Sequence, residues 1–319
     1  MSVSIAERLS LSTCWCSGRH VDGYEMVKEI VDLGFKYMEL SHGIRLSLVP
    51  GILKAIEEDL VRVSSVHNFC PLPHGINHPA PNLYEPSASD YREATQWWRH
   101  TKQTMDLAAR VGASRVILHS GSVRFFFSSP EKKLKNWLSS KDIPKSELLD
   151  NAEFKKRRNR AMKRIEKASA AAVERILKSY KQAILWAKER NLKLCLENRE
   201  GIEEMPIDAG FSDIFAVLSA PEQIGYWHDT GHAQIKHQLG LLDHQSHLAA
   251  MAEHLTGFHL HDVNEDGQDH QAPGTGIVDF RMVAEFVRPE HVLVLELSPR
   301  LQSEDVLASR DYLARTLSA

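Results

Sequence analysis

Six short apolar runs of the chain each end in a histidine or a carboxylate at the same relative place. Each run has the length and the β-branched content of a buried strand. One such residue at a strand end can be an accident, but six of them indicate strand ends that converge on one polar site. His, Asp and Glu bind divalent metals through nitrogen and oxygen atoms. The six residues are His67, His119, Glu197, Asp229, His259 and Glu296.

Strand and helix signals alternate along the whole chain. The first strand is expected over about 8–16 and the second over 36–41, and the six apolar runs supply the rest. Residues 70–90, rich in Pro and Asn, are expected to form a loop, and 121–151 an irregular segment. The expected helices are about 23–33, 47–58, 90–111, 152–190, 208–219, 233–254, one from 279, and 302–317.

This alternation predicts a parallel sheet, and eight such units predict an α/β fold of the closed (β/α)8 type, the TIM barrel. In that fold the active site lies at the C-terminal ends of the strands, where all six polar residues and Glu39 would meet. Successive side chains of a strand face opposite sides. His259 and His261 are therefore expected to face one side, and His228 to face away from Asp229.

The bulk composition fits one enzyme-sized domain of residues 1–319. The hydrophobic content of 43%, the charged content of 25% and the net charge of −3 point to no particular partner. The four cysteines form no CxxC pair, which argues against a structural zinc site. No signal peptide is recognised, and no apolar run approaches the roughly 18 residues that span a bilayer. We therefore expect a cytoplasmic protein without a membrane partner.

Three longer motifs carry a resemblance to a known superfamily: ENRE at 197–200, HDTGH at 228–232 and FHLHDVNEDGQDHQAPGTGIVDF at 258–280. The chain resembles the xylose-isomerase-like barrel superfamily, which includes sugar isomerases and epimerases and the endonuclease IV type of abasic-site nuclease. The resemblance implies a metal site on strands five to eight. Three carboxylates and one imidazole suit Mn²⁺, Mg²⁺, Co²⁺ or Zn²⁺. The implied ligands are Glu197, Asp229, His259 and Glu296.

The resemblance implies a metal-dependent isomerase or epimerase of a small-molecule sugar or sugar phosphate. A metal that chelates a ketose carbonyl and its neighbouring hydroxyl acidifies the adjacent C–H, and a carboxylate on each side can remove and return the proton. In the epimerases that this chain resembles, the first and last metal-bound glutamates, here Glu197 and Glu296, do this. His232 and Glu203 match substrate-contacting residues there, although the loop that carries Glu203 can shift by one position. The other candidate substrate-binding residues are His67, His119, His261 and His270.

An endonuclease IV-like phosphodiesterase is the alternative, and only this alternative has nucleic acid as a partner. In those enzymes histidines matching His67 and His119 bind a second zinc ion, bridged by the glutamate that matches Glu197. A third zinc ion uses a histidine matching His232 and an Asp-x-His motif, which reads Gln268-Asp269-His270 here. An amide is a weak, neutral zinc ligand, so Gln268 favours the isomerase, while a site for two ions remains open.

The segment of about 121–152, which leads into the long helix 152–190, departs from a minimal barrel. Residues 124–167 contain fourteen Lys or Arg and six Asp or Glu. Three interpretations of this segment are open. It is a lid over the barrel mouth, a patch that binds phosphate and stacks a base on residues 125–127, or a solvated helix face. A barrel that binds sugar without catalysis is a third reading. The sugar, the metal, the number of ions and a possible homo-oligomer all stay open.

Overall fold

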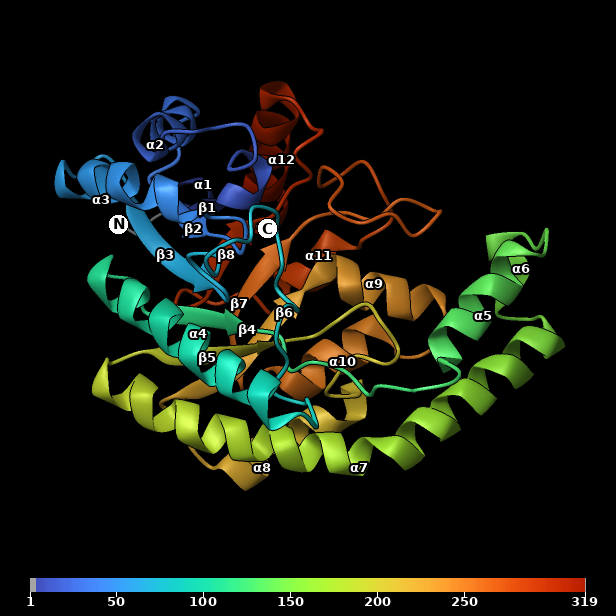
Figure 1. The fold of residues 1–319 in the computed structure, drawn as a ribbon. Coiled ribbons are helices and arrows are strands. Elements are labelled where there is room, and N and C mark those ends of the chain that lie inside the picture. The colour runs from blue at the N-terminus through green and yellow to red at the C-terminus, as the bar shows by residue number, and fades with distance from the viewer. Residues whose placement is uncertain (1–3, 319) are drawn as a thin grey trace.

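The eight expected strands form a closed parallel barrel, which confirms the predicted TIM-barrel fold (Figure 1). The computed structural model describes residues 4–318, without the side chain of residue 146. Each strand pairs with its neighbours in chain order, and β8 closes the ring by pairing with β1. The strands are β1 (Leu9–Ser12), β2 (Tyr37–Leu40), β3 (Arg62–His67), β4 (Arg115–Leu118), β5 (Lys193–Glu197), β6 (Ile224–Asp229), β7 (Leu255–Leu260) and β8 (Val292–Leu295).

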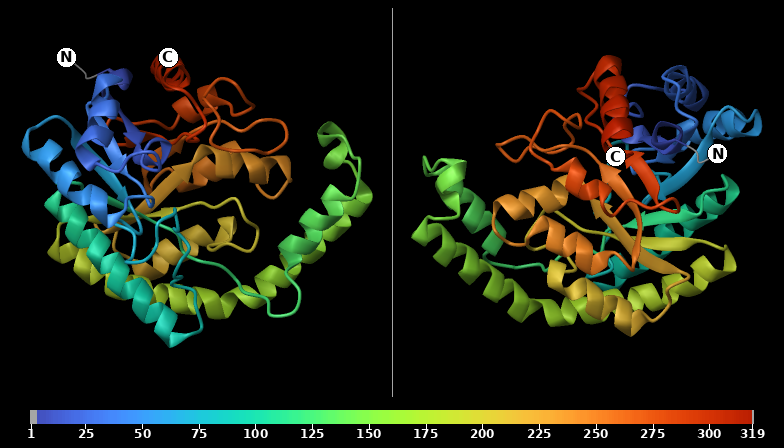
Figure 2. Two further views of the ribbon diagram at one scale, coloured as in Figure 1. Left: turned by 45° about the horizontal axis from the view of Figure 1, so that its top comes forward. Right: turned by 180° about the vertical axis from the view of Figure 1, so that it is seen from behind.

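Helices surround the barrel and connect successive strands (Figure 2). Short 3₁₀ turns, η1 (Thr13–Trp15), η2 (Leu46–Leu48) and η3 (Asp208–Gly210), lie in the connections. The helices are α1 (Ile5–Arg8), α2 (Gly23–Asp32), α3 (Val49–Glu57), α4 (Tyr91–Arg110), α5 (Pro130–Ser139), α6 (Lys145–Leu148), α7 (Ala152–Glu189), α8 (Phe211–Leu218), α9 (Thr230–Gln238), α10 (His244–Met251), α11 (Phe280–Ala284) and α12 (Ser303–Thr316).

Three expected boundaries were wrong, each for a local reason. β1 ends at Ser12 rather than near 16, because the Ser12 side chain accepts from the Cys14 amide and caps η1. The 121–151 segment is only partly irregular, because it contains α5 and α6: Ser129 caps α5, and Pro130 occupies its first turn. The single helix expected over 233–254 is two, α9 and α10, since the chain turns at Gly240 with a φ of 62°.

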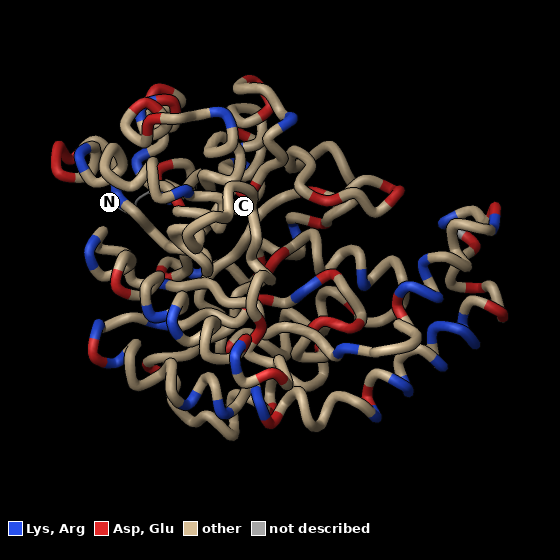
Figure 3. The backbone as a smooth tube through the Cα atoms, in the orientation of Figure 1, with Lys and Arg blue, Asp and Glu red and all other residues tan. Residues whose placement is uncertain are grey.

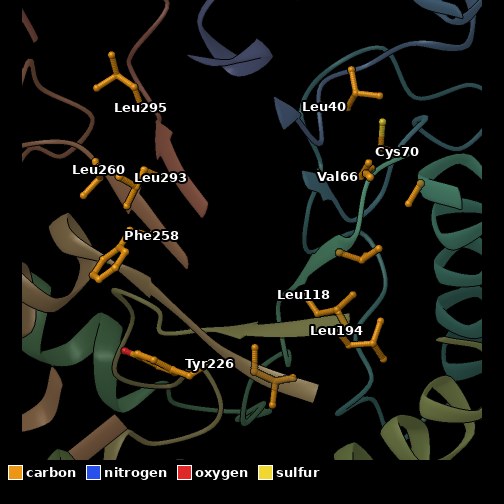
Figure 4. Close-up of a cluster of buried hydrophobic side chains, with 14 of the residues drawn as sticks. Leu40, Val66, Cys70, Leu118, Leu194, Tyr226, Phe258, Leu260, Leu293 and Leu295 are labelled. Carbon is orange, nitrogen blue, oxygen red and sulfur yellow. The ribbon is translucent and has the colours of Figure 1, made fainter. Parts of the chain in front are cut away.

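The alternation of side chains along the strands creates two separate cores. One set points outward and packs under the helices, as Leu118, Leu194 and Phe258 do (Figure 4). The other set points into the barrel, where a small cluster, Ile117, Cys195, Trp227 and Val294, fills the interior. One step further along the same inward faces the apolar residues give way to buried polar ones. The strands thereby carry the candidate site residues on an apolar floor.

Helix α7 is much longer than the barrel requires. Its 38 residues span about 57 Å at 1.5 Å per residue, so its N-terminal half extends beyond the barrel with α5 and α6 (Figure 1). Lys and Arg concentrate on this projecting arm (Figure 3). Phe126 and Phe127, just before α5, are 94% and 93% exposed. Within the described residues, no helix is long and apolar enough to cross a membrane.

Candidate metal centre and active site

Four of the six strand-end residues come together at the mouth of the barrel. Glu197, Asp229, His259 and Glu296 each offer one ligand atom, and these atoms all lie within 4.8 Å of one another. All four side chains are at most 5% exposed. Buried carboxylates that converge in this way need a cation to offset their charge. This donor set of three carboxylates and one imidazole fits a divalent metal ion.

His259 lies at the centre of this group with its two ring nitrogens in different surroundings. Nδ1 lies 2.7 Å from Oε1 of Glu197 and 3.0 Å from Oε2 of Glu296. Nε2 lies 3.1 Å from Oε2 of Glu39, whose carboxylate also accepts from the hydroxyls of Ser12 and Ser65. A proton on Nε2, donated to Glu39, leaves the Nδ1 lone pair facing the other carboxylates, which is the arrangement a metal ligand needs.

The electrostatics of the metal-free site agree with this view. Burial alone lowers the pKa of His259, but the carboxylates of Glu296, Glu39 and Glu197 raise it well above its ordinary value. Burial also works against charge on Glu197, yet Arg199 and His259 hold the pKa of its carboxyl well below its usual range. Without metal the imidazolium therefore acts as a cation among the carboxylates. A metal ion bound at Nδ1 would replace that proton.

His67 and His119 lie together on the far side of Glu197. Nε2 of His119 is 2.7 Å from Glu197 Oε2 without hydrogen-bond geometry, and Nε2 of His67 is 3.7 Å from the same oxygen. Nδ1 of His67 contacts the Asn68 carbonyl oxygen, and Nδ1 of His119 contacts Asn82 Oδ1. Burial and the charge of Arg199 lower the pKa of His119 to about 4. Both imidazoles thus direct an Nε2 toward Glu197.

The other three candidate histidines, His232, His261 and His270, lie near Asp229. The Asp229 carboxylate caps α9 by accepting from the His232 amide at 2.8 Å, and it also lies 3.0 Å from Nε2 of His261. His261 accepts from the His270 amide at its Nδ1, so its own Nε2 carries a proton toward Asp229. His261 therefore holds Asp229, a candidate metal ligand, in place. The ring of His270 stacks on that of His261 at 4.3 Å, and its Nε2 lies 4.0 Å from Glu296.

The acid of the 268–270 motif is Asp269 rather than a residue at position 268. Asp269 lies 3.1 Å from Nδ1 of His270 and 3.9 Å from Nε2 of His232, whereas Gln268 bonds to Asn264. His270 adopts a φ of 55°, which changes the direction of the chain at this point. For this reason, counting positions along the sequence does not show which of residues 268–270 faces His232.

The structure places Glu203 away from the cluster of metal-ligating atoms. Its carboxylate accepts from the Ser129 hydroxyl at 2.7 Å and from the Glu131 amide at 2.9 Å, so it holds the first turn of α5. The next residue, Glu204, instead faces Arg199, with 3.1 Å between Oε1 and Nε. Glu204 is therefore the acid that contacts Arg199, while Glu203, expected at the substrate, contacts α5.

Asp262 organises the turn that carries the PGTG sequence. The buried carboxylate accepts from the amides of Val263, Gly274, Gly276 and Val278, each at 2.9 Å. A side chain at Gly276 has no room, since its Cβ would lie 2.2 Å from the Val263 carbonyl oxygen. The acid three residues after His259 is thus explained by folding of this loop.

We expect Asp262→Ala to destabilise the protein by about 4 kcal/mol, because it leaves four backbone N–H groups without their charged acceptor. Urea unfolding followed by circular dichroism measures the change. The matched control is Asp243→Ala, which removes an exposed helix cap on α10 and should cost about 1 kcal/mol. Equal losses for the two variants would contradict this account of the loop.

Sequence reasoning missed several residues of the site. Arg199 follows Glu197 within the ENRE motif, but nothing in its spacing shows that the guanidinium turns back onto the glutamate. His42 follows β2 and is partly exposed, and its ring lies 4.7 Å from that of His67. Glu39 was placed at the mouth by its position in β2, while its contact with His259 became visible only in the structure.

The fold agrees with comparisons to known proteins. The model of the xylose isomerase-like TIM barrel family matches residues 27–315. The chain belongs to this family. No curated protein sequence matches the chain. The family membership confirms the resemblance drawn from the 197–200, 228–232 and 258–280 motifs.

Solved structures of this barrel type align over nearly the whole chain. A D-tagatose 3-epimerase-like protein aligns with a TM-score of 0.67 and 14% identity, over 98% of this chain and 97% of that chain. The 3-keto-D-glucoside 4-epimerase YcjR from E. coli aligns with a TM-score of 0.65 and 13% identity, over 98% and 99%. D-psicose 3-epimerase from Clostridium cellulolyticum H10 aligns with 0.64 and 11%, over 97% and 99%. At these identities the likeness shows the fold alone.

Proposed function

We propose that the protein is a divalent-metal-dependent isomerase or epimerase of a ketose or ketose phosphate. The observation that carries this proposal is the placement of Glu197 and Glu296 on Nδ1 of His259, at 2.7 and 3.0 Å. Two buried carboxylates thereby flank the position that a metal ion would take. A substrate carbon held beside that ion would have a carboxylate on each face.

The proposed roles follow from the surroundings of each residue. Glu197, Asp229, His259 and Glu296 would hold the ion, which supplies Lewis acidity that makes the C–H next to a carbonyl acidic. One of the two glutamates would take the proton, and the other would return a proton to the opposite face of the same carbon. Arg199 keeps Glu197 ionised and therefore able to accept, and His261 fixes Asp229.

The proposed substrate contacts are histidines that lie beside the candidate metal ligands. His232 is buried 3.3 Å from Asp229, and His270 is 32% exposed and 4.0 Å from Glu296; both would meet sugar hydroxyls. A separate cavity of about 370 Å³ on the projecting arm, between α5 and α7, is lined by four cations and no carboxylate, a lining that suits an anion such as phosphate. The lining residues are Pro130, Lys133, Leu134, Arg157, Arg160, Ala161 and Arg164. The four free cysteines suit a reducing cytoplasm, where we place the reaction.

Product analysis tests the proposal. Purified protein loaded with Mn²⁺, Mg²⁺, Co²⁺ or Zn²⁺ is incubated with a panel of ketoses and ketose phosphates, and the products are separated by chromatography. We expect one substrate class to convert to an equilibrium mixture with its epimer or isomer. The same panel without metal should stay unchanged. Absence of conversion across the whole panel would count against the proposal.

A second candidate function rests on the other side of Glu197. His67, His119 and Glu197 offer ligand atoms that all lie within 4.8 Å of one another, so a second ion has ligands available. A phosphodiesterase of the abasic-site nuclease type would use both ions. This candidate predicts at least two tightly bound ions per chain and cleavage of DNA that contains an abasic site. Against a second ion stands the guanidinium of Arg199, which already lies 3.0 Å from Oε2 of Glu197.

A further inference from the structure

Arg199 directs its guanidinium at the oxygen of Glu197 that faces His67 and His119. Nη1 of Arg199 lies 3.0 Å from Glu197 Oε2. That oxygen is the one that lies 2.7 Å from His119 Nε2 and 3.7 Å from His67 Nε2. The arginine side chain is 12% exposed. A positive charge therefore already lies where the two imidazoles and this carboxylate oxygen converge.

The position of Arg199 is fixed from its other side. Its Nε lies 3.1 Å from Oε1 of Glu204, and the second oxygen of Glu204 accepts from the Gly201 amide at 2.9 Å. A Cβ at position 201 would lie 2.8 Å from that same oxygen, so a glycine permits this close approach. The loop after β5 thus forms a continuous path from the Gly201 backbone through Glu204 and Arg199 to Glu197. Moving the guanidinium away would leave the carboxylate of Glu204 without its cation.

A divalent ion on the same oxygen would meet this guanidinium at short range. An ion bound to Glu197 Oε2 would stand about 2.1 Å from that oxygen and so within roughly 5 Å of Nη1. Two cations this close in buried surroundings repel each other strongly. Around Nδ1 of His259 three carboxylates offset the charge of an ion. On the His67 and His119 side the nearby carboxylates are Glu197 and Glu204, and the guanidinium of Arg199 already pairs with both.

We propose that Arg199 takes the place of a second metal ion, so that the site binds one metal ion per chain. The inference rests on the proposed metal centre and goes beyond it by fixing the number of ions and naming the residue that sets it. Arg199 acts here as a positioning residue that excludes a cation. His67 and His119 then face the substrate side of a mononuclear centre.

Elemental analysis after dialysis against Mn²⁺ or Zn²⁺ tests this inference without reference to activity. We expect one ion per chain in the wild type and two in Arg199→Met. The Arg199→Met/Glu204→Gln double variant should also bind two, and it avoids leaving the Glu204 charge buried alone. With Mn²⁺, electron paramagnetic resonance should show an exchange-coupled pair in both variants and an isolated ion in the wild type.

Two control variants locate the effect. Arg199→Lys keeps a positive charge near Glu197 and should still bind one ion. Arg199→Met/His119→Ala removes an imidazole of the vacated site and should return the count from two to one. Two ions in the wild type, or a folded double variant at Arg199 and Glu204 that still binds one, would overturn the inference. A wild type that binds no ion would instead overturn the metal centre itself.

Discussion

Replacing Glu296 by glutamine is expected to lower the rate of sugar conversion by about 10³-fold or more. General acid–base catalysis by a positioned side chain contributes about 10² to 10⁴, and an amide cannot take a proton from carbon. Glu296 also lies 3.0 Å from the metal-facing nitrogen of His259, so some loss of metal affinity should accompany the loss of rate. Initial rates at saturating metal separate these two effects.

The control for this variant lies at the other end of the same strand. Glu290 precedes β8 at the face opposite the site and is exposed, so Glu290→Gln should leave the rate unchanged. Sugar binding by Glu296→Gln, measured by calorimetry, should persist. If Glu296→Gln keeps the wild-type rate at saturating metal, Glu296 does not transfer the proton. If the wild type also binds sugar but converts none, the barrel is a binding protein.

Removing the metal is expected to stop conversion and to lower stability without unfolding the protein. A bound ion stabilises the fold by about 4 kcal/mol when its free concentration is 1,000 times its dissociation constant. The metal-free site should remain folded at neutral pH, because His259 then carries a proton among the carboxylates of Glu39, Glu197 and Glu296. Thermal unfolding of chelator-treated and reloaded protein measures the difference, and reloading should restore the rate.

The same chemistry sets the pH dependence of metal binding. Since the pKa of His259 is raised well above its ordinary value, an ion that binds at neutral pH must displace a proton. Affinity should therefore rise with pH up to the folded-state pKa and fall as the pH drops. Calorimetry in buffers of different ionisation enthalpy should detect about one proton released per ion. No proton release at neutral pH would show that His259 is not a ligand.

The sequence was sufficient for the residues that strands position. In a strand, burial and the two-residue alternation fix where a side chain points, so the apolar runs alone place Glu197, Asp229 and His259 at one mouth. The same alternation separates His228 from them: in the structure it bonds to Tyr226 and His244 behind β6. Because parallel strands have regular geometry, the direction of these side chains can be predicted from the sequence.

The residues that loops position escaped prediction for the opposite reason. Arg199, Glu204 and Asp269 follow strand ends by one or more residues, where no fixed period relates position to direction. The positive φ of His270 and the close packing of Gly201 against Glu204 decide which acid faces inward. As a result Glu204, and not its neighbour Glu203, is the acid that faces Arg199. The two helices α5 and α6 were not predicted, although Ser129 and Pro130, which mark the start of α5, can be read in the sequence.

The central claim is proton transfer at carbon, and isotope exchange measures it most directly. The metal-loaded protein is incubated in D₂O with each ketose and ketose phosphate, and the recovered sugar is examined by mass spectrometry and NMR. We predict one carbon-bound deuterium next to the carbonyl for at least one sugar, and none with metal-free protein. Absence of carbon-bound deuterium in every sugar, together with cleavage of abasic-site DNA, would contradict the account.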